Sequence, residues 1–165
     1  MKKYGFIGVG DQGGPIARRM IDAGLPTVLW ARRQESLVPF ADSGAEFAAS
    51  ITELASQVQY VGICVVNDVG VQDVCSQLMP VMRPGGCIVI HSTVNPDLCK
   101  KLAVQAAENE LELIDAPVSG GGQGAADGTL TIMVGGNAQV FDAVKPVFET
   151  FAGLITHLGD VGAGQ

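Results

Sequence analysis

The sequence predicts a single doubly wound α/β domain over residues 1–165, with a mainly parallel sheet and helices on both faces. Short apolar runs alternate with helical stretches of about ten residues along the whole chain, which is typical of βαβ units. The length of 165 residues is that of one domain with one sizeable core, and no internal linker or repeat interrupts it. Glycine supplies 22 residues, about twice its average share of roughly 7%, which indicates many tight turns and close backbone approaches.

The first half of the chain gives the clearest alternation. Strands are expected at 4–9, 27–30, 45–47 and 60–66, and helices at 15–23, 52–57 and 69–82. Gly24 stands where a left-handed residue ends the first helix. Ser36 is expected to cap a short helix that precedes Ser43.

The second half continues the pattern, with a change near its end. Strands are expected at 87–90, 111–116, 130–134 and 154–158, and helices at 96–109 and 138–151. The strand at 130–134 follows its predecessor through a glycine-rich loop at 120–124, so it is expected to return antiparallel at the sheet edge.

Charge and composition exclude several classes of function. Ten basic and 17 acidic side chains give a net charge of −7, which argues against a nucleic-acid-binding protein. The N-terminus lacks the features of a signal peptide, and no apolar run has the length of a membrane span, so we expect a soluble, cytoplasmic chain. Cys64, Cys75, Cys87 and Cys99 lack Cys-x-x-Cys spacing, so neither a metal site nor a disulfide framework is expected.

The turn after the first strand carries the first chemical motif. It reads G-x-G-x-x-G and opens the first helix, so its candidate cofactor-binding residues are Gly8, Val9, Gly10, Asp11, Gln12 and Gly13. In a Rossmann-type dinucleotide fold the first glycine permits the turn, the second admits the pyrophosphate, and the third lets the helix pack close to the strand. Free N–H groups at the helix N-terminus then face the phosphates. The alternative is a glycine turn without a ligand.

The end of the second strand bears on which dinucleotide would bind. NAD sites usually carry an Asp or Glu there, whereas this chain has Arg32 and Arg33. Guanidinium groups bind phosphate through bidentate hydrogen bonds, so we expect NADP(H), with its 2′-phosphate, as the preferred cofactor and NAD(H) as the second choice. Glu35 is the evidence against this, because its carboxylate could reach a ribose hydroxyl. Ordinary solvated arginines are the alternative.

A second motif begins at the end of the strand at 111–116. The run from Asp115 to Gly136 delivers Ser119 and bare glycine backbone to the carboxyl edge of the sheet, where open α/β folds bind ligands. The Ser119 hydroxyl and the amides of Gly120 and Gly121 suit a small carboxylate-bearing substrate. A glycine-rich turn before an edge strand is the alternative.

The same run resembles the substrate-binding signature of the β-hydroxyacid dehydrogenase family, which includes 3-hydroxyisobutyrate dehydrogenase and tartronate semialdehyde (2-hydroxy-3-oxopropionate) reductase. The glycine turn and the segment from Ser92 to Pro96 are similar to further signatures of that family. The resemblance implies cofactor contacts by Val66, Asn67 and Thr93, and reversible hydride transfer between NAD(P) and a small β-hydroxyacid or its semialdehyde. The related 6-phosphogluconate dehydrogenases share the Ser-Gly-Gly element but match the continuation from Gly128 less well.

Some positions depart from the family pattern. Gln12 stands where the family commonly has Met, Gly14 where its residue varies, and Arg19 where Asn is frequent. His91 precedes Ser92 where a small or acidic residue is usual. We expect His91 to have a structural role at the strand end rather than to transfer protons.

The resemblance also implies a catalytic lysine, at the start of a long interdomain helix, that would lie beyond Gln165. None of Lys2, Lys3, Lys100, Lys101 and Lys145 has that context, so no catalytic residue is expected within this sequence. The chain is therefore expected to be the cofactor domain of a two-domain homo-oligomeric enzyme, inactive without its all-helical partner domain. A stand-alone dinucleotide-binding module without catalysis remains the alternative.

Overall fold

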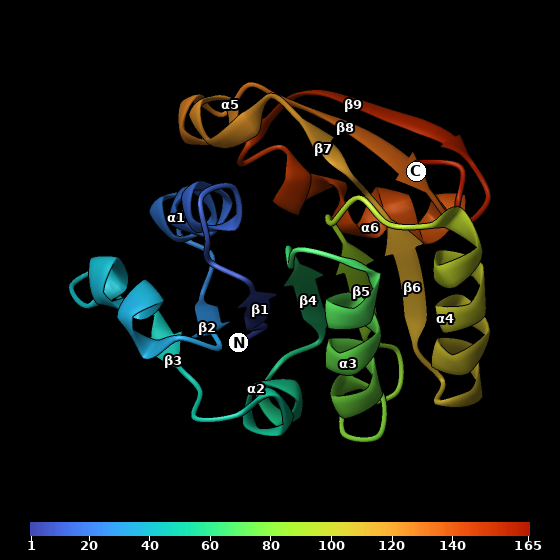
Figure 1. Ribbon diagram of the computed structural model, residues 1–165, viewed down its shortest axis with the longest axis horizontal. Helices are drawn as coiled ribbons and strands as arrows, with labels where there is room; N and C mark the ends of the chain where they lie inside the picture. Colours follow the sequence, from blue (N-terminus) through green and yellow to red (C-terminus); the bar gives the residue numbers. More distant parts are fainter.

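A nine-stranded sheet runs through the centre of the computed structural model, which describes residues 1–165 (Figure 1). The strands are β1 (Tyr4–Ile7), β2 (Thr27–Trp30), β3 (Glu46–Phe47), β4 (Tyr60–Ile63), β5 (Cys87–Ile90), β6 (Glu112–Asp115), β7 (Val118–Ser119), β8 (Leu130–Gly135) and β9 (Ala152–Gly159). The first six are parallel in the order β3-β2-β1-β4-β5-β6, which is the order of doubly wound dinucleotide-binding folds. The fold class predicted from the sequence is confirmed.

Seven helical segments cover the two faces of this sheet. They are α1 (Gly13–Asp22), η1 (Gln34–Phe40), α2 (Ile51–Gln57), α3 (Asp68–Leu78), α4 (Pro96–Glu108), α5 (Gly121–Asp127) and α6 (Ala138–Phe148). Side chains of α1, η1, α5 and α6 share one core cluster, and those of α2, α3 and α4 share the other. None of these helices combines the length and the apolar character needed to cross a bilayer.

Alternation along the strands divides the core into these two clusters of 23 buried residues each. Phe6 points into the cluster with α1, whereas its neighbour Ile7 points into the cluster with α3. Val89 and Ile90 divide in the same way on β5. A parallel sheet buried on both faces explains why its strands read as continuous apolar runs in the sequence.

Two predicted local structures were wrong. The segment expected to be a helix capped by Ser36 is the 3₁₀ helix η1, which begins at Gln34, so Ser36 lies inside it. The glycine-rich segment expected to be a loop at 120–124 forms α5 from Gly121 onward. Glycine is a poor helix former, but α5 packs its buried Ala125 into the core, and a Cβ on Gly122 would lie only 2.7 Å from the Asp11 carbonyl oxygen. Close packing against the glycine turn therefore outweighs helix propensity.

The end of the sheet also differs in detail from the prediction. Strand β8 is antiparallel to β6 and β7, as expected. It is not the edge strand, however, because β9 pairs with it in parallel through six residue pairs and lies outside it. Short strand β7 interrupts the expected glycine loop by pairing Val118 and Ser119 with β8.

Candidate cofactor-binding site

The glycine turn between β1 and α1 is tightly packed at two of its glycines and open at the third. Gly8 has φ +94°, and a Cβ there would overlap the Cys64 carbonyl oxygen. A Cβ on Gly13 would overlap the carbonyl oxygen of Gly8, so only glycine lets α1 begin this close to β1. A Cβ on Gly10, in contrast, would meet no atom within 4 Å. The fold itself therefore needs Gly8 and Gly13, while the absence of a side chain at Gly10 leaves space open for a ligand.

The same turn presents unpaired hydrogen-bond donors. The backbone N–H groups of Asp11 and Gln12 have no acceptor within the chain, and Gln12 is the N-cap residue of α1. These two N–H groups lie at the N-terminus of α1, which is the positive end of the helix dipole, so the turn is suited to an anion.

Two arginines extend the site at the end of β2. Arg32 and Arg33 are exposed, and no carboxylate forms an ion pair with either of them. Glu35 is exposed as well, and it borders a separate hollow with Arg33 and Ser36. Two cations without protein partners at this strand end suit a phosphate ligand.

A cavity of about 370 Å³ joins the glycine turn to the ends of β2 and β4. Of the residues singled out from the sequence, it is lined by Gly8, Val9, Gly10, Arg32, Arg33, Val66 and Asn67. Val66 is 96% exposed, so its apolar side chain is free to contact a ligand. Asn67 caps α3 by accepting a hydrogen bond from the Gly70 N–H at 2.9 Å, which fixes the loop after β4.

The second motif lies at the same edge of the sheet but outside this cavity. Ser119 is exposed and ends β7, and Gly120 follows with φ +132°. The amide of Gly120 has no acceptor within the chain. Because Gly122 packs against the carbonyl of Asp11, the Ser119 motif and the glycine turn are in contact.

Thr93 lies on the loop between β5 and α4, and its side chain is exposed at the carboxyl edge. The flanking Ser92 is buried, and its hydroxyl accepts a hydrogen bond from the Val65 N–H at 2.9 Å. This hydrogen bond joins the loops after β4 and β5 at the residue that precedes Thr93.

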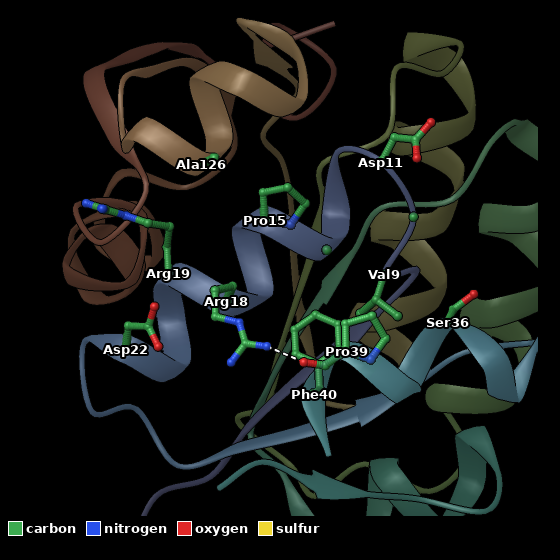
Figure 2. Close-up of a pocket in the computed structure, with 12 residues that line it drawn as sticks. Val9, Asp11, Pro15, Arg18, Arg19, Asp22, Ser36, Pro39, Phe40 and Ala126 are labelled. Carbon is green, nitrogen blue, oxygen red and sulfur yellow. Dashed lines mark hydrogen bonds between the residues drawn. The ribbon is translucent and has the colours of Figure 1, made fainter. Parts of the chain in front are cut away.

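A second cavity of about 530 Å³ lies on the α1 side of the glycine turn (Figure 2). It shares Val9, Gly10 and Ser36 with the first cavity. Its two arginines are held by backbone carbonyls. Arg18 donates to the Pro39 oxygen, as Figure 2 shows, and its guanidinium lies over the Phe40 ring. Arg19 donates to the Thr150 oxygen at 2.9 Å. These contacts tie α1 to η1 and to the end of α6.

His91 is buried among aromatic side chains, with Phe6 stacked on its ring. Its Nδ1 lies 2.9 Å from the Ala116 carbonyl oxygen, which can only accept, so Nδ1 carries the hydrogen. Its Nε2 then accepts from the Tyr60 hydroxyl at 3.4 Å. Burial lowers the pKa of His91 to about 4, so the ring is neutral at pH 7 and structural in role.

Two residues without a functional signature in the sequence organise this edge. Asp115 begins the second motif, and its buried carboxylate accepts three backbone hydrogen bonds from the last residues of the chain. Gln165 joins those residues to the loop that carries Thr93. The only signal in the sequence is an acidic residue at the end of an apolar run, next to a glycine-rich motif, because the partners lie about 50 positions away.

The strand order, the glycine turn and the cavity at the carboxyl edge together define a dinucleotide-binding α/β domain. Residues 3–159 match the model of the NAD binding domain of 6-phosphogluconate dehydrogenase, and the chain belongs to that family. This agrees with the resemblance to β-hydroxyacid dehydrogenases noted in the sequence.

Relatives within the family are named as oxidoreductases. The chain is 34% identical over 167 residues to the probable mitochondrial 3-hydroxyisobutyrate dehydrogenase of Dictyostelium discoideum, covering 99% of this chain and 52% of that protein. It is 34% identical over 175 residues to the NAD-dependent L-serine dehydrogenase of Pseudomonas aeruginosa, covering 100% of this chain and 56% of that protein.

Solved structures agree with these relationships. The structure of Psf3 in complex with NADP+ and 2-OPP superposes with a TM-score of 0.94 at 28% identity, covering 98% of this chain and 58% of that one. The chain thus spans about half the length of the relatives it matches.

Proposed function

We propose that the chain is the NADP(H)-binding half of an oxidoreductase that transfers a hydride between NADP(H) and a small β-hydroxyacid or its semialdehyde. The observation that carries this proposal is the open space at Gly10 beside the unpaired guanidinium groups of Arg32 and Arg33. A pyrophosphate would lie on the glycine turn and the adenosine in the cavity beyond it. Val66 and Asn67 would contact the cofactor from the loop after β4.

The choice of NADP(H) over NAD(H) rests on the two arginines. A 2′-phosphate beside them would gain charge-assisted hydrogen bonds, each contributing roughly 1.5–3 kcal/mol. Relatives alone do not decide the matter, because one is named as NAD-dependent and another was solved with NADP+.

The test is a fluorescence titration of NADPH and NADH with the 165-residue chain and its Arg32→Asp variant. NADPH affinity should fall by about tenfold or more in the variant, which corresponds to 1.4 kcal/mol, and NADH affinity should change little. Arg83→Asp is the matched control, since this exposed arginine lies in the turn before β5, at the opposite edge of the sheet. An unchanged preference in Arg32→Asp would refute the assignment.

For the substrate, we propose that Ser119, Gly120 and Gly121 bind a carboxylate. The exposed hydroxyl and the unpaired Gly120 amide are suitable donors, and the contact of Gly122 with Asp11 places them beside the glycine turn. The cofactor supplies the hydride, while these residues would bind and orient the substrate.

Under the same proposal, the general acid or base would come from the part of the enzyme that corresponds to the unmatched half of each relative's sequence. An acid or base must lie within hydrogen-bond reach of the reacting oxygen. Lys100 and Lys101 are exposed on α4 and Lys145 is exposed on α6, so all three project from helices that flank the sheet. A steady-state assay with NADPH and a panel of small semialdehydes should show cofactor binding without turnover. Turnover by this chain alone would contradict that expectation.

A further inference from the structure

The last six residues of the chain are fixed to the end of β6 by one buried carboxylate. Oδ1 of Asp115 accepts a hydrogen bond from the Gly162 N–H at 2.6 Å. Its Oδ2 accepts from the N–H groups of Gly164 and Gln165, at 2.9 and 3.1 Å. Asp115 has 0% of its surface exposed and no cationic partner, so backbone N–H groups alone compensate its burial. Burial raises the pKa of Asp115, and these three hydrogen bonds act in the opposite direction.

Glycines surround this carboxylate where the chain must come close to it. A Cβ on Gly135 would lie 2.6 Å from Oδ1 of Asp115 and 2.8 Å from the Ala163 nitrogen. A Cβ on Gly164 would lie 2.8 Å from Oδ2 of Asp115. Any side chain at either position would separate the terminal segment from β6 and β8.

Gln165 extends this attachment to the loop after β5. Its Oε1 accepts a hydrogen bond from the Val94 N–H at 3.0 Å, and its Nε2 donates to the Ser92 carbonyl oxygen at 3.2 Å. One amide side chain therefore binds the backbone on both sides of Thr93. Because the Ser92 hydroxyl also accepts from Val65, a continuous set of hydrogen bonds joins the loops after β4 and β5 to the end of β6.

We propose that Gln165, held in place by Asp115, is a positioning residue that fixes Thr93 at the nicotinamide end of the cofactor site. This inference rests on the proposed function. The sheet order places β2, with its arginines, on one side of β1 and places β4, β5 and β6 on the other. A dinucleotide with its adenosine end at Arg32 therefore reaches the loops after β4 and β5 with its nicotinamide end. Gln165 itself need not touch the cofactor, since it acts through the backbone of Ser92 and Val94.

The experiment compares two ligands that differ only at that end. NADP+ and 2′-phospho-ADP-ribose, which lacks the nicotinamide, are titrated calorimetrically into the wild-type chain and into Gln165→Ala. Affinity for NADP+ should fall by about tenfold in the variant, while affinity for 2′-phospho-ADP-ribose should stay within about twofold. Gln105→Ala, which changes an exposed glutamine on α4, is the control and should bind both ligands as the wild type does.

Hydrogen exchange gives a second readout. The Val94 amide should exchange faster in Gln165→Ala, because its acceptor is removed. Asp115→Asn should reproduce the selective loss of NADP+ affinity if it folds, and Gln165→Ala decides the matter if it does not.

Equal affinities in wild type and Gln165→Ala would overturn the inference, and so would an equal loss for both ligands, because that loss would reflect a general weakening of the fold. Failure of the wild-type chain to bind either ligand would instead refute the proposed function.

Discussion

Two glycines of the same turn should respond differently to the addition of one methyl group: Gly13→Ala should lose stability, and Gly10→Ala should lose affinity for the cofactor. In Gly13→Ala the new Cβ would overlap the carbonyl oxygen of Gly8, which is backbone and cannot rotate away. Overpacking of this kind costs about 1–3 kcal/mol in the free energy of unfolding. For a chain of this size, that lowers the melting temperature by roughly 2–4 °C per kcal/mol.

In Gly10→Ala the Cβ would meet no protein atom within 4 Å, so the unfolding free energy should change by less than about 0.5 kcal/mol. The methyl group would instead occupy the space proposed for the pyrophosphate. Affinity for NADP+ should therefore fall at least about tenfold, which corresponds to 1.4 kcal/mol.

The assays are urea unfolding for stability and calorimetric titration of NADP+ for binding. Gly153→Ala is the matched control, since its Cβ would make only ordinary contacts of 3.4 Å or longer on the outer strand β9. Wild-type NADP+ affinity in Gly10→Ala would refute the role given to that glycine. Wild-type stability in Gly13→Ala would refute the packing argument.

Three further predictions follow from burial and exposure. Folded His91 has a pKa of about 4 and the unfolded residue about 6.5, so its contribution to stability, on the order of 3 kcal/mol, should be complete above pH 6.5 and lost as the pH falls toward 4; urea unfolding of His91→Gln should show a shallower decline, and parallel declines would contradict this. Burial raises the pKa of the Cys64 thiol to about 11, so a thiol reagent should label it slowly at pH 8. Cys64 lines the cavity, so bound NADP+ should cover it and slow the labelling further, and faster labelling would count against the site. Strand β9 exposes Leu154 by 58% and Leu158 by 52%, so the chain should self-associate at raised concentration and Leu154→Lys should reduce this, whereas a monomer at every concentration in size-exclusion chromatography would disprove it.

Local patterns in the sequence were sufficient to predict the parallel half of the fold. Buried strands such as β5, predicted and observed at 87–90, are continuous apolar runs, and glycine-bounded helices lie between them. The turn from Gly8 to Gly13 could be placed because its position between a strand and a helix gives the pattern meaning.

Features that depend on distant contacts could not be predicted in this way. Helix α5 forms from a glycine-rich segment that packs against Asp11 at Gly122 and buries Ala125 in the core. The attachment of Gln165 to Asp115 joins residues 50 positions apart, and no periodicity records such a bond. Gly10 is a different case. No contact within the chain requires a glycine at this position, whereas a bound pyrophosphate would.

The central claim is that the carboxyl edge of this sheet binds NADP(H), and it is tested most directly by an NMR titration of the ¹⁵N-labelled chain with NADP+. The amides of Asp11 and Gln12 should shift most, because they have no acceptor within the chain, together with those of Arg32, Arg33, Val66, Asn67 and Thr93. Saturating shifts confined to these loops are the predicted result. A spectrum unchanged at millimolar NADP+, or shifts confined to the opposite edge of the sheet, would contradict the claim.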